Sequence, residues 1–185
     1  MAQPICATLR RKFPDTLKTM NITIRNVLPS DANAITDVIN PIIQDGKSTL
    51  LDTPFSASDQ SFFIQYFPVN GVFLVAQNTD TAKVVGYQTV EPFASYTRAL
   101  DHVGILTTYV EQASRQQGVA SALFASTFET AKARGFEKLI ANIRADNQAA
   151  IDAYLKQGFD IAGTAKKHAK INGEYIDEMM LEKFL

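Results

Sequence analysis

A polar turn near the middle of the chain has residue types suited to binding a phosphate group. Its sequence, Arg115-Gln-Gln-Gly118-Val-Ala120, separates a β-branched stretch from an apolar segment of helical period. The first amide groups of a helix lack an intrahelical acceptor, and the helix dipole adds partial positive charge there. Gly118 has no side chain to keep an anion away from the main chain. The turn therefore predicts a pyrophosphate site, with an ordinary tight helix start as the alternative.

A second segment could supply a proton donor. It runs Asn147-Gln-Ala-Ala-Ile-Asp-Ala-Tyr154-Leu-Lys-Gln-Gly158-Phe159. Asparagine is a favoured N-cap residue, which predicts that a helix begins after Asn147. Within that helix, the phenol of Tyr154 has a reference pKa of about 10 and could protonate a leaving group near neutral pH. The alternative is a core tyrosine that packs against Ile151 on the same helix face.

Hydrophobic periodicity predicts the elements that must position these segments, in the order β-α-(α)-β-β-β-α-β-α-β-β. Expected strands cover residues 22–27, 72–77, 83–90, 103–110, 138–143, 159–164 and 175–184, and expected helices cover 30–45, 56–66, 120–133 and 147–155. Ser30 is the expected N-cap of the first helix, Ser56 or Ser58 of the second, and Asp146 or Asn147 of the last.

Composition limits the class of protein. A chain of 185 residues with 46% hydrophobic and 20% charged residues is typical of one globular domain, expected at residues 21–185. The net charge is -1 and no basic patch stands out in the sequence, so nucleic acid is not an expected partner. Cys6 is the single cysteine, so neither a disulfide framework nor a cysteine-based zinc site is expected, and a reducing cytoplasm fits. The sequence has no apolar run of about 18 residues, so no transmembrane helix is expected.

The first twenty residues form an N-terminal extension that we expect to be loosely ordered. They contain Arg10, Arg11, Lys12 and Lys18, and they lack the apolar core of a secretory signal. Translation from an early start codon is favoured over a targeting role, because Met20 directly precedes the first expected strand.

Taken together, the two motifs resemble those of the GCN5-related N-acetyltransferases, the GNAT superfamily. The first is Arg115-x-x-Gly118-x-Ala120, and the second is the Asn147 to Phe159 block described above. The resemblance implies an α/β (α+β) fold with a mixed, mostly antiparallel sheet of about six to seven strands flanked by helices and splayed between the fourth and fifth strands. It implies acetyl-CoA as the cosubstrate and no metal.

The resemblance also implies which residues hold acetyl-CoA. The pyrophosphate would sit on the amides of residues 116–121, and the pantetheine arm would lie beside the fourth strand. The expected cofactor-binding residues are Tyr109, Val110, Arg115, Gln116, Gln117, Gly118, Val119, Ala120, Ser121, Asn142 and Asn147. The amide of Val110 could also hold the thioester oxygen. Tyr154 matches the position where the family often places a general acid near the coenzyme sulfur.

The general base is open. The chain is most similar to the phosphinothricin-type amino-acid acetyltransferases, which often carry a glutamate early in the fourth strand. Ile105 stands at that position here, so the base of the subgroup is missing. His102, with a reference pKa near neutrality, and Glu91 are the candidate bases, and a water chain to backbone carbonyls is the alternative. Arg98 is a candidate for binding a substrate carboxylate, with a solvated surface arginine as the alternative.

The expected reaction is transfer of acetyl to the primary amine of a small molecule, such as an amino acid or an analogue, by direct attack in a ternary complex. A peptide or protein amine is a second hypothesis, which an unobstructed segment at residues 47–66 would favour. A non-catalytic CoA-binding module is the third. Cys6 lies in the extension, which argues against a covalent intermediate. Similar proteins often pair as homodimers, and a cytoplasmic location is expected.

Overall fold

The computed structural model describes residues 19–185, in which four α-helices and seven strands follow one another in the predicted order. The strands are β1 (Ile22–Asn26), β2 (Val72–Asn78), β3 (Val84–Pro92), β4 (Val103–Val110), β5 (Lys138–Arg144), β6 (Asp160–Ile171) and β7 (Glu174–Phe184). The helices are α1 (Ala32–Asp45), α2 (Ala57–Gln65), α3 (Val119–Ala133) and α4 (Gln148–Lys156). The predicted extension at residues 1–20 lies almost wholly outside the described residues, and so does Cys6.

The strands form one sheet in the order β1-β2-β3-β4-β5-β7-β6. Every neighbouring pair is antiparallel except β4 and β5, which are parallel. This mixed and mostly antiparallel sheet confirms the predicted fold class. In residues 19–185, no helix has the length and apolar character that crossing a membrane would require.

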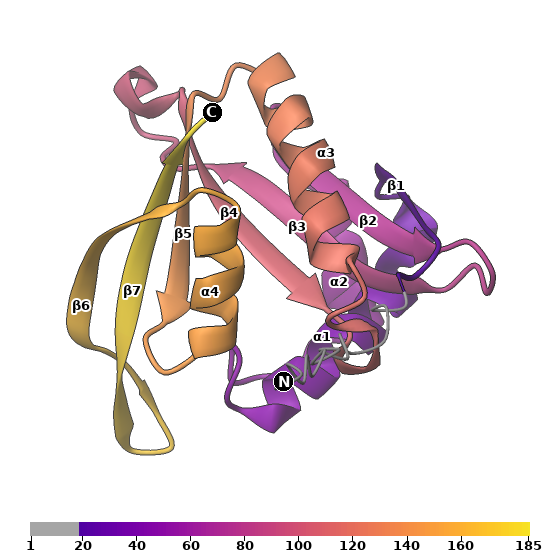
Figure 1. Cartoon of the computed structure of the whole chain (residues 1–185), viewed down its shortest axis with the longest axis horizontal. Helices are drawn as coiled ribbons and strands as arrows, with labels where there is room; N and C mark the ends of the chain where they lie inside the picture. The colour runs from indigo at the N-terminus through magenta and orange to yellow at the C-terminus, as the bar shows by residue number, and fades with distance from the viewer. Residues whose placement is uncertain (1–18) are drawn as a thin grey trace, which may run out of the picture.

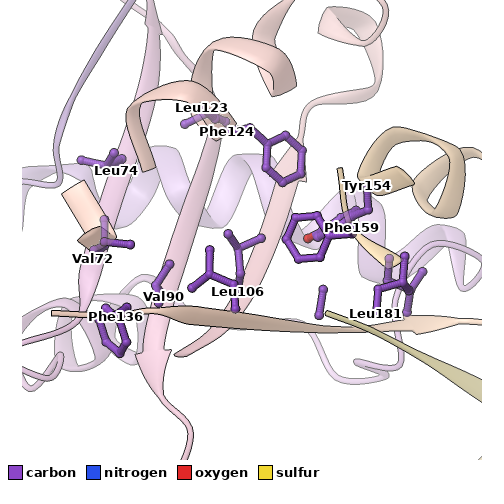
Figure 2. Close-up of a cluster of buried hydrophobic side chains, with 14 of the residues drawn as sticks. Val72, Leu74, Val90, Leu106, Leu123, Phe124, Phe136, Tyr154, Phe159 and Leu181 are labelled. Atoms are coloured by element: carbon purple, nitrogen blue, oxygen red, sulfur yellow. The ribbon is translucent and has the colours of Figure 1, made fainter. Parts of the chain in front are cut away.

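Helices cover both faces of the sheet, so the domain has three layers (Figure 1). Apolar side chains of α1 pack against one face, which includes the buried residues Phe73, Val75 and Tyr87. The opposite face packs against α3 and α4 through a second core cluster, whose labelled members in Figure 2 include Leu106, Phe124 and Tyr154. Alternation of side chains along each strand supplies both faces.

The sheet opens between β4 and β5, as predicted. Ladder pairing joins Val103 to Lys138, Gly104 to Leu139 and Ile105 to Ile140, and then it stops. Both strands continue, and they diverge toward the lower part of Figure 1. β3 pairs with β4 along its whole length, and β7 does the same for β5. Each strand is thus held by its outer neighbour while the inner edges stay apart. We call this space the β4–β5 opening, with its vertex at the Ile105–Ile140 pair.

The close packing at the vertex depends on Gly104. A Cβ atom at this position would collide with the side chain of Val90 and would lie 3.1 Å from Phe136. Since both neighbours are buried core residues, neither has room to move. Gly104 therefore lets the short β4–β5 ladder form where the two strands meet.

Local capping largely follows the sequence, with one wrong prediction. Ser30 is not the N-cap of α1, because Pro29–Asp31 forms a 3₁₀ turn that ends where α1 begins. The carboxylate of Asp31 instead accepts the amide of Leu28 at 2.8 Å and binds Arg25 with both oxygens. Bonds from Asp31 to Leu28 and to Arg25 of β1 thus replace the expected serine cap.

The other predicted caps are resolved by the structure. Ser56, rather than Ser58, caps α2 in a reciprocal arrangement with Asp59. Asn147, rather than Asp146, caps α4 by accepting the amide of Ala150 at 3.2 Å. β6 extends past the predicted end at residue 164 to Ile171, because it pairs with β7 through two register irregularities.

Candidate active site

The turn before α3 presents main-chain amides at the wide end of the β4–β5 opening. Gln116 has φ 60° and Gly118 has φ 86°, so the chain takes a left-handed conformation twice before the helix starts. Among residues 19–185, no acceptor bonds the amides of residues 116–121. The carbonyl of Gln117 accepts the amide of Met20 at 3.1 Å, which fixes the turn from outside. The predicted pyrophosphate site thus has its donors free, in the arrangement that suits an anion.

The edge of β4 that faces the opening also carries free donors. The amide of Glu111 donates to the carbonyl of Val85 on β3. Because successive residues of a strand point their amides to opposite edges, the amide of Val110 points into the opening. On the same edge, the Nε of Arg115 donates to the carbonyl of Val110 at 3.2 Å. Arg115 therefore joins the amide-rich turn to the strand edge.

The hydroxyl of Tyr154 lies at the opening. α4 packs the ring edge-on against Phe124 and Phe159, with centroids 5.0 and 5.1 Å away (Figure 2). The hydroxyl is 2.9 Å from Oγ1 of Thr108, a β4 residue beyond the last pair with β5. Burial raises the pKa of Tyr154, so the phenol keeps its proton at neutral pH. The two hypotheses for this residue are compatible, because its ring belongs to the core while its hydroxyl reaches the edge of the opening.

A short chain of hydrogen bonds orients that phenol. The Nε2 of Gln88 on β3 donates to Oγ1 of Thr108 at 2.6 Å. Because a hydroxyl has one proton and two lone pairs, Thr108 can accept this bond and still either donate to or accept from the Tyr154 hydroxyl. Gln88 thereby holds Thr108, and Thr108 holds the phenol, in one orientation. Gln88 and Thr108 were not predicted from the sequence, although polar residues inside an otherwise apolar strand were a signal for them.

A half-buried carboxylate lies on the α1 face near the vertex. Glu91 on β3 is directly opposite Ile105 in the ladder, so the two side chains share one face of the sheet. In the described part of the chain, Glu91 makes neither a side-chain hydrogen bond nor an ion pair, and burial raises its pKa. It lines a hollow of about 760 Å³ together with Arg98 and Asp101. Arg98 is exposed and lies 3.6 Å from the Asp101 carboxylate.

The structure does not bring His102 to the opening. Its side chain is exposed on the turn before β4, and its carbonyl accepts the amides of Glu137 and Lys138. These contacts lie at the closed end of the β4–β5 pair, where the ladder begins with Val103. Of the two candidate bases, Glu91 is therefore the one beside the vertex.

The two asparagines predicted to bind the cofactor differ in their exposure and in the hydrogen bonds that their side-chain amides make. Asn142 is exposed on the diverging part of β5. Asn147 has both ends of its amide engaged, since Oδ1 caps α4 and Nδ2 donates to the carbonyl of Ser48 at 3.1 Å. Cofactor contacts by either residue stay predictions.

Arg144, a buried charge at the end of β5, was also not predicted from the sequence. Its Nε and Nη2 donate to the carboxylate of Asp146 at 2.9 and 2.8 Å. Its Nη1 donates to the carbonyls of Gly46 and Thr49 at 2.8 and 3.3 Å. The signal was an arginine inside the buried strand 138–144, since such a charge is buried only with partners.

Two further observations concern metal-binding side chains and a second hollow. In residues 19–185, His, Cys, Asp and Glu side chains do not gather in groups of three that could hold a metal ion. A second hollow of about 380 Å³ lies between α1 and residues 111–115, next to the amide-rich turn. The site thus combines anion-binding amides, a strand edge with free donors, a protonated phenol and a half-buried carboxylate.

Comparison with known proteins gives consistent results. The family model described as "Acetyltransferase (GNAT) domain" matches residues 24–180. A phosphinothricin N-acetyltransferase of Streptomyces coelicolor is 24% identical over 89% of this chain and 97% of its own length. Two solved structures superpose with TM-scores of 0.82 and cover 88–99% of the chains compared. One is a ribosomal-protein-alanine N-acetyltransferase of Brucella melitensis (27% identity), and the other is a phosphinothricin acetyltransferase of Sinorhizobium meliloti in complex with AcCoA (23%).

Proposed function

The chain belongs to the GNAT acetyltransferase family, and from this membership we propose that residues 21–185 transfer acetyl from acetyl-CoA to the primary amine of a small molecule. One observation carries the proposal: the β4–β5 opening has amide donors at its wide end and the Tyr154 hydroxyl at its edge. The pyrophosphate would bind the amides of residues 116–121. The pantetheine arm would bond the free edge of β4 near Val110, which would also satisfy that edge.

The site residues have distinct roles in this reaction. Glu91 would accept a proton from the ammonium form of the amine, directly or through water, so that the lone pair can attack the thioester carbonyl. The amide of Val110 would stabilise the oxyanion. As the C–S bond of the tetrahedral intermediate breaks, Tyr154 would donate its proton to the coenzyme thiolate, and the second proton that the nitrogen loses on becoming an amide would restore the phenol, directly or through water. This sequence needs no covalent enzyme intermediate.

A small acceptor is favoured over a peptide by the segment at residues 47–66. A peptide would need this segment to be clear of the opening. Instead, Arg144 and Asn147 hold the carbonyls of residues 46–49 next to the end of β5. The relatives support the same class, because the Streptomyces coelicolor relative is named for phosphinothricin. The ribosomal-protein-alanine enzyme keeps the peptide hypothesis as the second candidate.

The deciding experiment is a thiol-release assay with acetyl-CoA and a panel of amines. The panel should include free amino acids, phosphinothricin, methionine sulfoximine and short peptides. We expect CoA release with at least one free amino acid or analogue, and acetylated product by mass spectrometry. Release with peptides alone would favour the second candidate. Binding of acetyl-CoA without release for any amine would favour the non-catalytic module.

A substitution at Gly118 tests the cofactor site separately. Gly118→Val places a β-branched residue at φ 86°, and its side chain would occupy space expected for the phosphates. We expect the Kd for acetyl-CoA, measured by calorimetry, to rise about tenfold or more, equivalent to about 1.4 kcal/mol. Gly135→Val is the matched control, because Gly135 follows the other end of α3 with φ 89° and open space around it. Equal Kd changes in both variants would contradict the site.

A cytoplasmic location and a homodimer are part of the proposal. The single cysteine suits a reducing compartment. Exposed apolar side chains on the β6–β7 hairpin, Ile161, Tyr175 and Phe184, offer a surface for pairing. Light scattering on the purified protein measures the oligomeric state directly.

A further inference from the structure

The loop after α1 is tied to the far side of the β4–β5 opening. Gly46 ends α1 in a left-handed conformation, and the next residues run to the end of β5. There, the carbonyls of Gly46 and Thr49 accept Nη1 of Arg144, and the carbonyl of Ser48 accepts Nδ2 of Asn147. We call residues 46–49 the strap. Its partners lie more than ninety positions away in the sequence.

Arg144 is built to hold this strap in one place. Its side chain is only 7% exposed, and Asp146 engages Nε and Nη2 in a two-pronged pair. Nη1 is thereby aimed at the strap carbonyls. A buried guanidinium needs a partner for each donor, and main-chain carbonyls at 2.8 and 3.3 Å supply them. Movement of the strap would leave buried donors unpaired, so the clamp resists it.

The strap also lies close to β4. Thr49 is buried, and Leu51, two residues after it, packs against the same core cluster as Tyr109. The Thr49 side chain also opposes the increase in pKa that burial causes at Tyr109. Tyr109 is on β4, beyond the last pair with β5, whereas Arg144 is on β5. The strap therefore lies next to both strands at the wide part of the opening. Tyr109 packs with the α1-side core, so the strap crosses on the same face as Glu91.

We propose that the Arg144 clamp makes the strap a fixed wall of the acceptor site, and that Arg144 is a positioning residue that sets how large an amine can reach the thioester. The inference rests on the proposed function. On this inference, an amine that approaches the vertex from the α1 face would have the strap on one side of it. A free amino acid would fit beside the strap, whereas a longer chain attached to the same amine would run into it.

The test compares Arg144→Lys with wild-type enzyme on two probes that share one amine. The probes are the best free amino acid of the panel and a tetrapeptide that begins with the same residue. Lysine keeps the charge but cannot bind Asp146 and two carbonyls at once. We expect the ratio of kcat/KM for the amino acid to that for the tetrapeptide to fall about tenfold, mainly through a lower KM for the tetrapeptide. The Kd for acetyl-CoA should stay within twofold.

Arg25→Lys is the matched control. Arg25 makes the same two-pronged bond to a carboxylate, with Asp31 at 2.7 and 2.9 Å, but it lies on β1 at the edge of the sheet. Both variants should lower Tm, since each loses a bidentate pair. The specificity ratio should change in Arg144→Lys and stay constant in Arg25→Lys. A purely structural role for Arg144 would lower Tm without changing the ratio.

The outcomes separate this inference from the proposed function. If wild-type protein acetylates no amine, the proposed function falls and this inference falls with it. If wild-type protein acetylates amines and Arg144→Lys keeps the wild-type ratio, the inference alone is overturned. If Arg144→Lys does not fold, Asp146→Asn takes its place, because Asp146 is 60% exposed and orients the guanidinium. A ratio that falls about threefold in Asp146→Asn supports the clamp, and an unchanged ratio overturns it.

Discussion

Replacing Tyr154 by phenylalanine is expected to lower kcat about a hundredfold or more while the Kd for acetyl-CoA stays within twofold. General acid catalysis typically contributes a factor of about 10² to 10⁴. The ring of phenylalanine keeps the edge-on contacts with Phe124 and Phe159, so α4 should stay in place. The variant therefore removes the proton donor while keeping the packing. Single-turnover kinetics with the best amine of the panel, together with calorimetry, measure the two quantities.

Thr108→Val is the companion variant. It keeps the shape of the side chain but removes the hydroxyl that lies 2.9 Å from Tyr154 and accepts Nε2 of Gln88. We expect kcat to fall less than in Tyr154→Phe, because the phenol remains but loses its orientation. An unchanged kcat in Tyr154→Phe would remove this residue from the mechanism and leave it as a core tyrosine.

Replacing Glu91 by glutamine is expected to lower kcat/KM for the amine about a hundredfold without lowering Tm. Loss of a general base accounts for the rate. The stability follows from the raised pKa of Glu91. A carboxyl whose pKa is higher in the folded state stabilises the fold only while it is protonated, and this contribution disappears as pH rises through the folded-state pKa. The ionised carboxylate has no hydrogen-bond or ion-pair partner among residues 19–185, so a neutral glutamine at position 91 should leave Tm equal or higher.

The dependence of activity on pH gives a second measurement for Glu91. With Glu91 as the base, wild-type kcat/KM should fall as pH decreases through its raised pKa, and Glu91→Gln should lose this acidic limb. Glu182→Gln is the matched control, because Glu182 pairs with Lys138 on the β5–β7 ladder. It should keep both the rate and the limb. Equal acidic limbs in wild type and Glu91→Gln would exclude Glu91 as the base.

Moving the carboxylate across the ladder provides a stringent form of this test. Ile105 is opposite Glu91 on the same face, and it is the position at which the resemblance to the phosphinothricin-type subgroup leads us to expect a glutamate. The double variant Glu91→Gln, Ile105→Glu returns the carboxylate to β4. We expect it to recover part of the activity lost in Glu91→Gln. A double variant no faster than Glu91→Gln would mean that a carboxylate at position 105 on β4 cannot take the role proposed for Glu91 on β3.

The elements and the amide-rich turn could be predicted from the sequence because their causes are local. Alternating and helical periods fix strands and helices within a few residues. Gly118 marked a positive φ, and Asn147 supplied a helix cap, both through contacts within a few positions along the chain. The one wrong cap, Ser30, arose because Asp31 at the same turn binds Arg25 of β1. The preference of serine for the N-cap position was thus outweighed by the bond between Asp31 and Arg25.

Only the tertiary structure decided which side chains surround the opening. Strand pairing places Glu91 opposite Ile105 and His102 at the end where β4 and β5 meet. Packing of α4 on the sheet places Thr108 beside Tyr154. It also joined Arg144 to carbonyls at residues 46 and 49. Such contacts join segments that are distant in the sequence, and main-chain carbonyls carry no residue-specific signal. The sequence by itself thus determined the elements and the expected ligand, whereas the positions of the proposed base and of the proposed wall of the acceptor site depend on how the strands of the whole sheet pair.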